Sequence, residues 1–306
     1  MDKENLKSLN IVICCFNDYT SSLIFEQLIY SPYVNVKAII FQAGYNSRDP
    51  GLLKGAIKHL KNMSKKYWLY LVLINGMFLF ISYVNSKLSQ PIKFNHRVTL
   101  KVAAKINKIP IYLVEDWNSQ PTIDLIKSYN PEIILIRIGA ILGSEFIDLA
   151  NIGVYCIHSS VLPKYKGIAA EFHASRNNDR SIGTTIFRVN SDLDAGPIIA
   201  QQCIITKQEF SVFKRMLLNN LLASRLLEQT MGNIFHMQEE FKNNKYKIKI
   251  TQENSYFGWP TKENMKELRK RKIPVFEIND FFEIFNCTIS ESKNVKFAEN
   301  PTIFYI

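Results

Sequence analysis

Short apolar segments alternate with amphipathic segments along most of the chain. The apolar segments predict strands at residues 11–16, 34–41, 111–114, 132–138, 154–157, 182–189 and 197–205. Apolar residues at helical spacing predict helices near residues 23–29, 97–107, 123–128 and 210–230. Fully apolar strands that alternate with helices are typical of a parallel sheet covered on both faces. We therefore predict an α/β fold with a Rossmann-like, mostly parallel sheet.

One segment, residues 67–84, is apolar over almost its whole length and is interrupted only by Asn75, Gly76 and Ser82. On length alone it is a borderline membrane-spanning helix. The strands predicted before and after it should share one sheet, however, and a single span would place them on opposite sides of a bilayer. We therefore expect a buried helix, a helix in the membrane interface, or an oligomer contact.

The charge of the chain is concentrated around this segment. The 306 residues include 38 Lys and Arg against 27 Asp and Glu, a formal net charge of +11. Residues 50–114 contain no acidic residue, and the rest of the chain carries 27 cations against its 27 anions. Lys54, Lys58, Lys61 and Lys65 have helical spacing and precede the apolar run, as in basic amphipathic helices that bind anionic membrane surfaces. A homodimer interface or a solvated helical cap is the alternative for this insertion at residues 51–90.

The cysteines and the N-terminus indicate a cytoplasmic location, with membrane association as an addition. The five cysteines form no C-x-x-C pair and no spacing typical of a disulfide framework or a metal site. The first ten residues lack an apolar core of signal-peptide length.

The candidate chemistry lies in residues 153–167 and 183–199. His158 follows a predicted strand and precedes a Ser-Ser-x-Leu-Pro turn, at the strand end where open α/β sheets bind ligands. Asp194 lies in a loop between two later strands, where a carboxylate can orient a histidine for acid–base work. Taken alone, such a His is more often a structural hydrogen-bonder, and such an Asp often lies only in a turn.

Together these passages resemble the formyltransferases that use 10-formyltetrahydrofolate. That family includes methionyl-tRNA formyltransferase, glycinamide ribonucleotide transformylase and the sugar-nucleotide N-formyltransferases. Its pattern is Asn-x-His-x-Ser-Leu-Leu-Pro-x-Tyr-Arg-Gly, then Gly-Val-Thr-x-His, then Asp-x-Gly-x-Ile. The residues that match in order and spacing are His158, Ser160, Leu162, Pro163, Tyr165, Gly167, Gly183, Thr185, Asp194, Gly196 and Ile198. The resemblance covers roughly residues 8–43 and 97–230.

The resemblance implies transfer of a formyl group to an amine, with His158 and Asp194 as the catalytic pair. Two positions depart from the family pattern: Cys156 replaces its catalytic Asn, and Phe187 replaces a common second His. Residues two apart on a strand share a face, so Cys156 and His158 should project together. Three readings follow: a slower enzyme, a Cys156 nucleophile that relays the formyl group, and a degenerate site that only binds ligand.

The resemblance also assigns binding residues. The folate donor should contact Arg137, Ile138, Gly139, Ala140, Ile141 and Leu142, and the loop of Ser191, Asp192 and Leu193 should close the other side. The acceptor should contact Ser160, Lys164, Tyr165, Lys166 and Gly167. The two lysines suit a phosphorylated acceptor, although loop lysines are usually only solvated.

The length of the chain bears on the acceptor. We expect a catalytic domain at residues 1–236, including the insertion, and a small extension at 237–306 with a helix capped at Thr261. The extension does not show the evenly spaced strands of a β-barrel, which disfavours tRNA and nucleic acid in general. We predict an N-formyltransferase for a small substrate amine, most plausibly a nucleotide- or lipid-linked amino sugar. A catalytically degenerate binding protein and a methionyl-tRNA formyltransferase are the alternatives.

Overall fold

The computed structural model describes residues 8–43, 63–85, 87–88, 97–191, 196–242, 256–286, 296–297 and 303–304. Its larger strands are β1 (Leu9–Cys15), β2 (Val34–Gln42), β3 (Ile111–Val114), β4 (Ile133–Arg137), β5 (Gly153–His158), β7 (Ser181–Arg188) and β8 (Ile198–Ile205). Two-residue strands are β6 (Lys166–Gly167), β9 (Tyr256–Phe257), β10 (Lys296–Phe297) and β11 (Ile303–Phe304).

The main sheet has the strand order β3-β2-β1-β4-β5-β7-β8, and both β10 and β11 pair with β8. The strands from β3 to β5 are parallel, and β7 and β8 continue the sheet in antiparallel pairing. The order leaves β1 in the middle, with later strands added on either side, as in doubly wound α/β folds. The predicted α/β fold class is confirmed.

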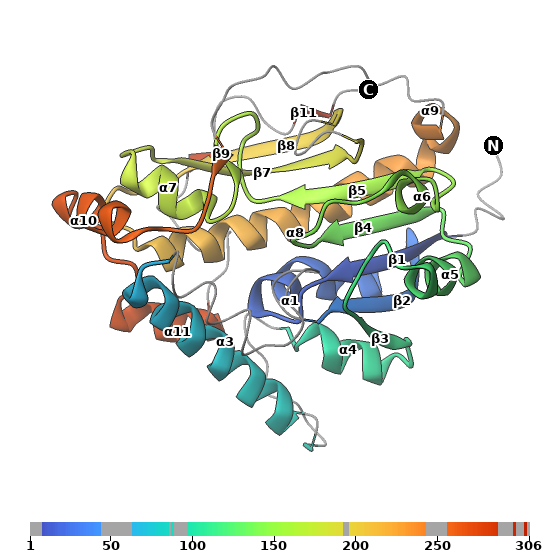
Figure 1. Cartoon of the computed structure of the whole chain (residues 1–306), viewed down its shortest axis with the longest axis horizontal. Helices are drawn as coiled ribbons and strands as arrows, with labels where there is room; N and C mark the ends of the chain where they lie inside the picture. Colours follow the sequence, from blue (N-terminus) through green and yellow to red (C-terminus); the bar gives the residue numbers. More distant parts are fainter. Residues whose placement is uncertain are drawn as a thin grey trace.

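Helices cover both faces of this sheet (Figure 1). One face packs against α1 (Tyr19–Phe25), the 3₁₀ helix η1 (Glu26–Tyr30), α4 (Leu100–Ile106) and the long α8 (Val212–His236). The other face packs against α5 (Gln120–Ser128), α6 (Ser144–Ile147) and the buried Trp117. Alternate residues of the strands supply the two cores, because successive side chains of a strand point to opposite faces. Ile133 and Leu135 belong to the first core, and Ile134 and Ile136 to the second.

The apolar segment forms α3 (Lys65–Asn85), a helix with one buried face. The buried residues follow at spacings of three and four: Tyr67, Tyr70, Ile74, Phe78, Ser82 and Asn85. The helix is long and apolar enough to cross a membrane, and 28% of its most apolar window is buried in the protein. Because β2 and β3, on either side of it in the chain, are hydrogen-bonded neighbours, a single crossing by α3 would have to separate two paired strands.

Elements that follow α8 in the chain pack against the predicted catalytic domain. These elements are α9 (Gln238–Lys242), α10 (Lys262–Lys270) and α11 (Ile278–Asn286). β9 pairs with β6, and α10 packs against α7 (Ala170–Arg176). As predicted, Thr261 caps a helix, and its side chain accepts a hydrogen bond from the backbone N–H of Asn264. The predicted domain boundary after residue 236 stays a prediction.

Candidate functional site

The last residues of β5 place two side chains together at the carboxyl edge of the parallel strands. Cys156 and His158 are half-buried, whereas Ile157 between them and Tyr155 before them are buried. This alternation puts Cys156 and His158 on the same face, as expected. His158 Nε2 lies 3.4 Å from the backbone oxygen of Tyr165, so the loop after β5 folds back over the imidazole.

Thr185 on β7 holds that loop in place. It is the direct cross-strand partner of His158, and it is fully buried. Its hydroxyl donates to the oxygen of Ser160 at 2.7 Å and accepts from the N–H of Leu162 at 3.0 Å. Gln201 on β8 donates to the same hydroxyl at 2.8 Å. The Thr185 hydroxyl therefore bonds both the Ser160 oxygen and the Leu162 N–H in the turn after His158. Through Thr185 and Gln201, this turn is connected to β7 and β8.

Two glycines of the motif are required by close packing around this loop. A Cβ on Gly183 would lie 2.3 Å from the backbone oxygen of Gln202, and one on Gly196 would lie 1.7 Å from that of Arg188. Both distances are far inside van der Waals contact with rigid backbone atoms. The motif thus encodes the packing of the loop as well as its chemistry.

The neighbouring cross-strand pair is apolar. Cys156 lies opposite Phe187, and the pair packs with Leu162, Ile198 and Val189. The two departures from the family pattern are therefore direct neighbours across the β5–β7 ladder. Cys156 is half-buried and packs against the hydrophobic side chains of this cluster.

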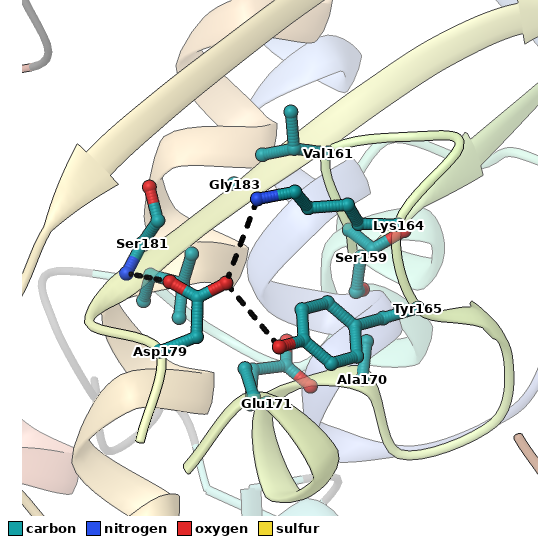
Figure 2. Close-up of a pocket in the computed structure, with 12 residues that line it drawn as sticks. Ser159, Val161, Lys164, Tyr165, Ala170, Glu171, Asp179, Ser181 and Gly183 are labelled. Atoms are coloured by element: carbon teal, nitrogen blue, oxygen red, sulfur yellow. Dashed lines mark hydrogen bonds and ion pairs between the residues drawn. The ribbon is translucent and has the colours of Figure 1, made fainter. Parts of the chain in front are cut away.

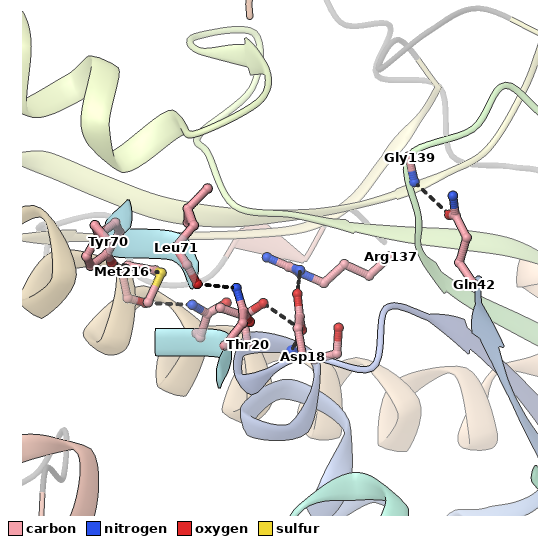
Figure 3. A network of polar contacts seen from close by, with 11 residues as sticks. Asp18, Thr20, Gln42, Tyr70, Leu71, Arg137, Gly139 and Met216 are labelled. Atoms are coloured by element: carbon pink, nitrogen blue, oxygen red, sulfur yellow. Dashed lines mark hydrogen bonds and ion pairs between the residues drawn. The ribbon is translucent and has the colours of Figure 1, made fainter. Parts of the chain in front are cut away.

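The end of β4 contributes a cation to the same edge. Arg137 pairs with Asp18 at 3.8 Å, and Asp18 also caps α1 by accepting from the N–H of Ser21 (Figure 3). Asp18 follows β1, and sequence reasoning did not select it. Its position directly after an apolar strand is the signal that could have found it, because β1 and β4 are parallel neighbours and end at the same edge.

The predicted folate segment leaves β4 without regular structure at residues 138–142. Gly139 donates its N–H to Oε1 of Gln42 at 3.3 Å, whereas Nε2 of Gln42 is buried with no partner among the described residues (Figure 3). Ile141 is 66% exposed, and Leu142 is buried in the core beneath α5 and α6. The segment thus presents backbone and one apolar side chain at the edge, beside an unsatisfied amide.

A cavity of about 80 Å³ lies beside the β5 end, between the loop, α7 and the start of β7 (Figure 2). Three of the five predicted acceptor residues line it: Ser160, Lys164 and Tyr165. Asp179 forms a small network at its wall, accepting from the Tyr165 hydroxyl at 3.2 Å and from the Ser181 N–H at 2.8 Å. Lys164 approaches the same carboxylate at 3.9 Å.

The remaining predicted site residues are dispersed. Lys166 is buried in β6 and Gly167 has a φ of +94°, and neither lines the cavity. Ser191 is exposed, whereas Asp192, Leu193 and Asp194 lie outside the described residues. The predicted roles of these residues remain predictions.

A second buried acid, Glu171 on α7, also lines the cavity. It is 7% exposed, and its Oε1 accepts from Nδ2 of Asn219 on α8 at 2.8 Å. Burial raises the pKa of this carboxyl above its ordinary value, and the hydrogen bond from Asn219 partly opposes the rise. Sequence reasoning missed Glu171, because an acidic residue in the first turn of a helix usually has only a capping role.

Comparison with known proteins supports the resemblance. A family model described as formyl transferase matches residues 98–214, which include β4, β5, the motif loop and β7. This part of the chain is therefore similar to the formyl transferase family. Methionyl-tRNA formyltransferase of Thermotoga neapolitana is 31% identical over 145 residues, 47% of this chain and 44% of that protein. The Kosmotoga olearia enzyme of the same name is 30% identical over 162 residues, 51% of this chain and 52% of that protein.

Solved structures share the fold of the formyltransferase domain. Phosphoribosylglycinamide formyltransferase from Bacillus halodurans superimposes with a TM-score of 0.50 and 17% identity, over 78% of this chain and 98% of that one. A sugar 3N-formyl transferase solved with dTDP and 5-N-formyl-THF gives a TM-score of 0.50 and 18% identity, over 90% of this chain and 82% of that one. The chain spans about half the length of the curated relatives it matches.

Proposed function

We propose that the chain transfers a formyl group from 10-formyltetrahydrofolate to the amine of a small substrate. The observation that carries the proposal is the position of His158. It lies at the carboxyl edge of the sheet, beneath a loop that Thr185 holds from the opposite strand, and it adjoins a cavity lined by predicted acceptor residues. An acid–base residue held next to a cavity is what amine acylation requires.

The residues after β4 fit the folate donor. The irregular backbone of residues 138–142, the exposed Ile141 and the unpartnered Nε2 of Gln42 together suit a flat heteroaromatic ring with polar edges. When bound, 10-formyltetrahydrofolate supplies the formyl group. Ser191, Asp192 and Leu193 complete this site in the proposal.

The resemblance assigns the proposed roles of the chain's own residues. His158 holds a proton at the ring nitrogen that faces the reacting groups, and Asp194 keeps the imidazole charged and helps to remove the amine proton. Cys156 stands where the family has an amide donor, and a thiol is a weaker hydrogen-bond donor than an amide. We therefore expect slow transfer relative to family members with Asn at this position, since one such donor is worth about 10²–10³ in rate.

The test is release of tetrahydrofolate from 10-formyltetrahydrofolate in the presence of an acceptor panel. The panel contains nucleotide-linked amino sugars, a lipid-linked amino sugar and methionyl-tRNA, since the curated relatives carry the name of that last acceptor. We expect release that depends on an amino sugar. Donor binding without turnover for any acceptor would favour the alternative, a binding protein on the same fold.

We further propose that α3 attaches the protein to an anionic membrane surface. The residues that leave an apolar face exposed along α3 are Leu69, Val72, Leu73, Leu79, Phe80 and Tyr83. Ile278 and Phe282 of α11 are exposed as well, and α3 and α11 both contact Tyr19. Lys65, Lys66 and Lys87 are exposed near the helix ends. The basic residues Lys54, Lys58 and Lys61 lie outside the described residues.

Point substitutions test the membrane proposal better than deletion of residues 51–90. The buried face of α3 packs on Tyr19, Phe172 and Phe213, so its removal would expose the core. The double variant Leu73→Glu with Phe80→Glu changes only exposed positions. We expect it to lose co-sedimentation with phosphatidylserine-containing vesicles, since each side chain contributes about 1.5–3 kcal/mol when fully buried.

The matched control is Leu113→Glu on β3, which is 70% exposed and lies on another part of the surface. It should bind vesicles as the wild type does. Equal binding by the double variant would contradict the proposal. A lipid-free dimer that the double variant dissociates would assign the face to self-association instead.

A further inference from the structure

Lys164 and Lys166 suggested from the sequence a positively charged site for a phosphorylated acceptor. The cavity does not have that charge. Lys164 is 62% exposed at its side chain and lies 3.9 Å from Asp179, while Lys166 is buried and does not line the cavity. The charged residues that line the cavity are therefore Glu171, Asp179 and Lys164. Two acids against one cation make the cavity a poor site for a phosphate and a suitable one for a cation.

Asp179 and Glu171 differ in whether a neighbouring cation compensates the charge of the carboxylate. Asp179 accepts from Tyr165 and Ser181 and also faces Lys164, so its charge is compensated within the wall. Glu171 accepts from the neutral amide of Asn219, and Asn219 in turn donates to the oxygen of Ser159 and accepts from Thr184. The Asn219 network orients the Glu171 carboxylate without neutralising it.

A second, independent feature points to a ligand in the same cavity. Ser160 also lines it, and the residue is 3% exposed. Its Oγ has no hydrogen-bond partner among the described residues. A buried hydroxyl without a partner costs stability unless a ligand or solvent satisfies it.

We propose that Glu171 and Ser160 bind the acceptor's amino group as it arrives in its ammonium form, which makes this cavity the amine subsite of the site that contains His158. The Glu171 carboxylate then accepts one proton from the ammonium, which leaves the neutral amine whose lone pair can attack the formyl carbon. An ammonium group has three N–H donors and no acceptor, and it matches a carboxylate and a hydroxyl oxygen together. This inference rests on the proposed function and names the acceptor class: a primary amine with uncharged groups next to the nitrogen.

The cavity, of about 80 Å³, is open to solvent on one side. It has room for an amino group, while the rest of a larger acceptor such as an amino sugar can extend through the opening.

The test measures binding without a formyl donor, so that it is independent of turnover. The probes are glucosamine, which carries an ammonium group, and glucose, which has a hydroxyl in its place. Saturation-transfer NMR with the full chain at pH 7 should show glucosamine bound in the millimolar range and glucose at least about tenfold more weakly.

Glu171→Gln keeps an oxygen for Asn219 and removes only the charge. It should weaken glucosamine binding about tenfold or more, because the ammonium loses its charged partner. The matched control is Glu239→Gln on α9, an exposed acid whose side chain is 78% exposed and pairs with Lys242. It makes the same change in net charge and should bind as the wild type does.

Ser160→Ala keeps the proposal testable if Glu171→Gln does not fold. Because Ser160 Oγ has no partner, the variant should melt no lower than the wild type while glucosamine binding weakens several-fold. A merely structural serine would give the reverse pattern. Glucosamine binding that Glu171→Gln leaves within about threefold of the wild type, or that glucose matches, would overturn the inference.

The two proposals fail separately. Glucosamine binding with no formyl transfer to any acceptor would remove the proposed function and leave the amine subsite. Formyl transfer with an acceptor KM that neither Glu171→Gln nor Ser160→Ala changes would do the opposite. No glucosamine binding by the wild type at saturating probe concentrations would also count against the subsite.

Discussion

Two neighbouring cross-strand pairs of the β5–β7 ladder differ in whether they keep the family motif and in the polarity of their surroundings. His158 opposite Thr185 retains the motif, and the pair is surrounded by hydrogen bonds that hold the loop. Cys156 opposite Phe187 departs from the motif, and the pair is packed among apolar side chains. The hydrogen-bonded loop around His158 therefore retains the motif among the described residues, while the neighbouring pair has a thiol where the family pattern has an amide donor.

The largest expected effect on the formylation rate comes from substitution of His158, in the pair that keeps the motif. His158→Ala should lower kcat/KM for amine formylation about 10³-fold, in the range typical of a lost acid–base residue. The folate-release assay measures it. His236→Ala, at the exposed end of α8, is the control and should leave the rate unchanged. A loss smaller than about tenfold would mean that His158 is structural.

The next effect concerns the partner of His158. Thr185→Val removes one hydroxyl that serves Ser160, Leu162 and Gln201, and leaves buried polar groups unpaired. We expect the free energy of unfolding to fall by about 2–4 kcal/mol in chemical denaturation. Thr230→Val on α8 is the control: its buried hydroxyl makes one bond, to the oxygen of Leu226, and should cost about 1 kcal/mol. Equal losses would mean that Thr185 has no special role in holding the loop.

Replacing Cys156 by Asn should distinguish the three hypotheses for this position: a slower enzyme, a thiol nucleophile and a site that only binds ligand. Cys156→Asn should raise the formylation rate about 10–100-fold if the thiol only replaces a donor. The same variant should lose about 1–3 kcal/mol of stability, because an amide then sits among Phe187, Leu162 and Ile198. Complete loss of activity would identify the thiol as a nucleophile. Absence of activity in both proteins would leave a site that only binds.

The smallest effect is a pH dependence that Glu171 adds to stability. Burial raises its pKa in the folded state above the ordinary value of 4.5, so its contribution to stability is full below that pH and is lost as pH rises through the folded-state pKa. Glu171→Gln does not ionise. Relative to the wild type, it should therefore be stabilised above the folded-state pKa and show no gain at acid pH. Thermal unfolding between about pH 4 and pH 8 measures the difference. A pH-independent difference would contradict the raised pKa.

Most of the fold could be predicted because its signals are local. The observed strand Ile111–Val114 coincides with the predicted one, and β1, β2, β4 and β5 differ from the predictions by at most a few terminal residues. Apolar runs are confined to strands buried on both faces, and such runs are visible in a linear sequence. The shared face of Cys156 and His158 followed from the two-residue period of a strand alone.

The candidate site could be predicted only in part. Glu171 and Asp179 carry no sequence signal that distinguishes them from capping or surface acids, and Asp18 is marked only by its position after an apolar strand. The three acids lie on three different segments. They come together with His158 or Arg137 only because α7 folds against α8 and because β1 and β4 end at one edge. The burial of Lys166 likewise depends on β9, some ninety residues later in the chain.

The sequence by itself determined the order of strands and helices, the formyltransferase motif and its two departures, and the concentration of charge around the apolar insertion. Only the tertiary structure decided which acids line the cavity and which face of α3 remains exposed. Periodicity states which side chains share a face, whereas burial and charge at a site depend on what packs against that face. In this protein those neighbours come from distant parts of the chain.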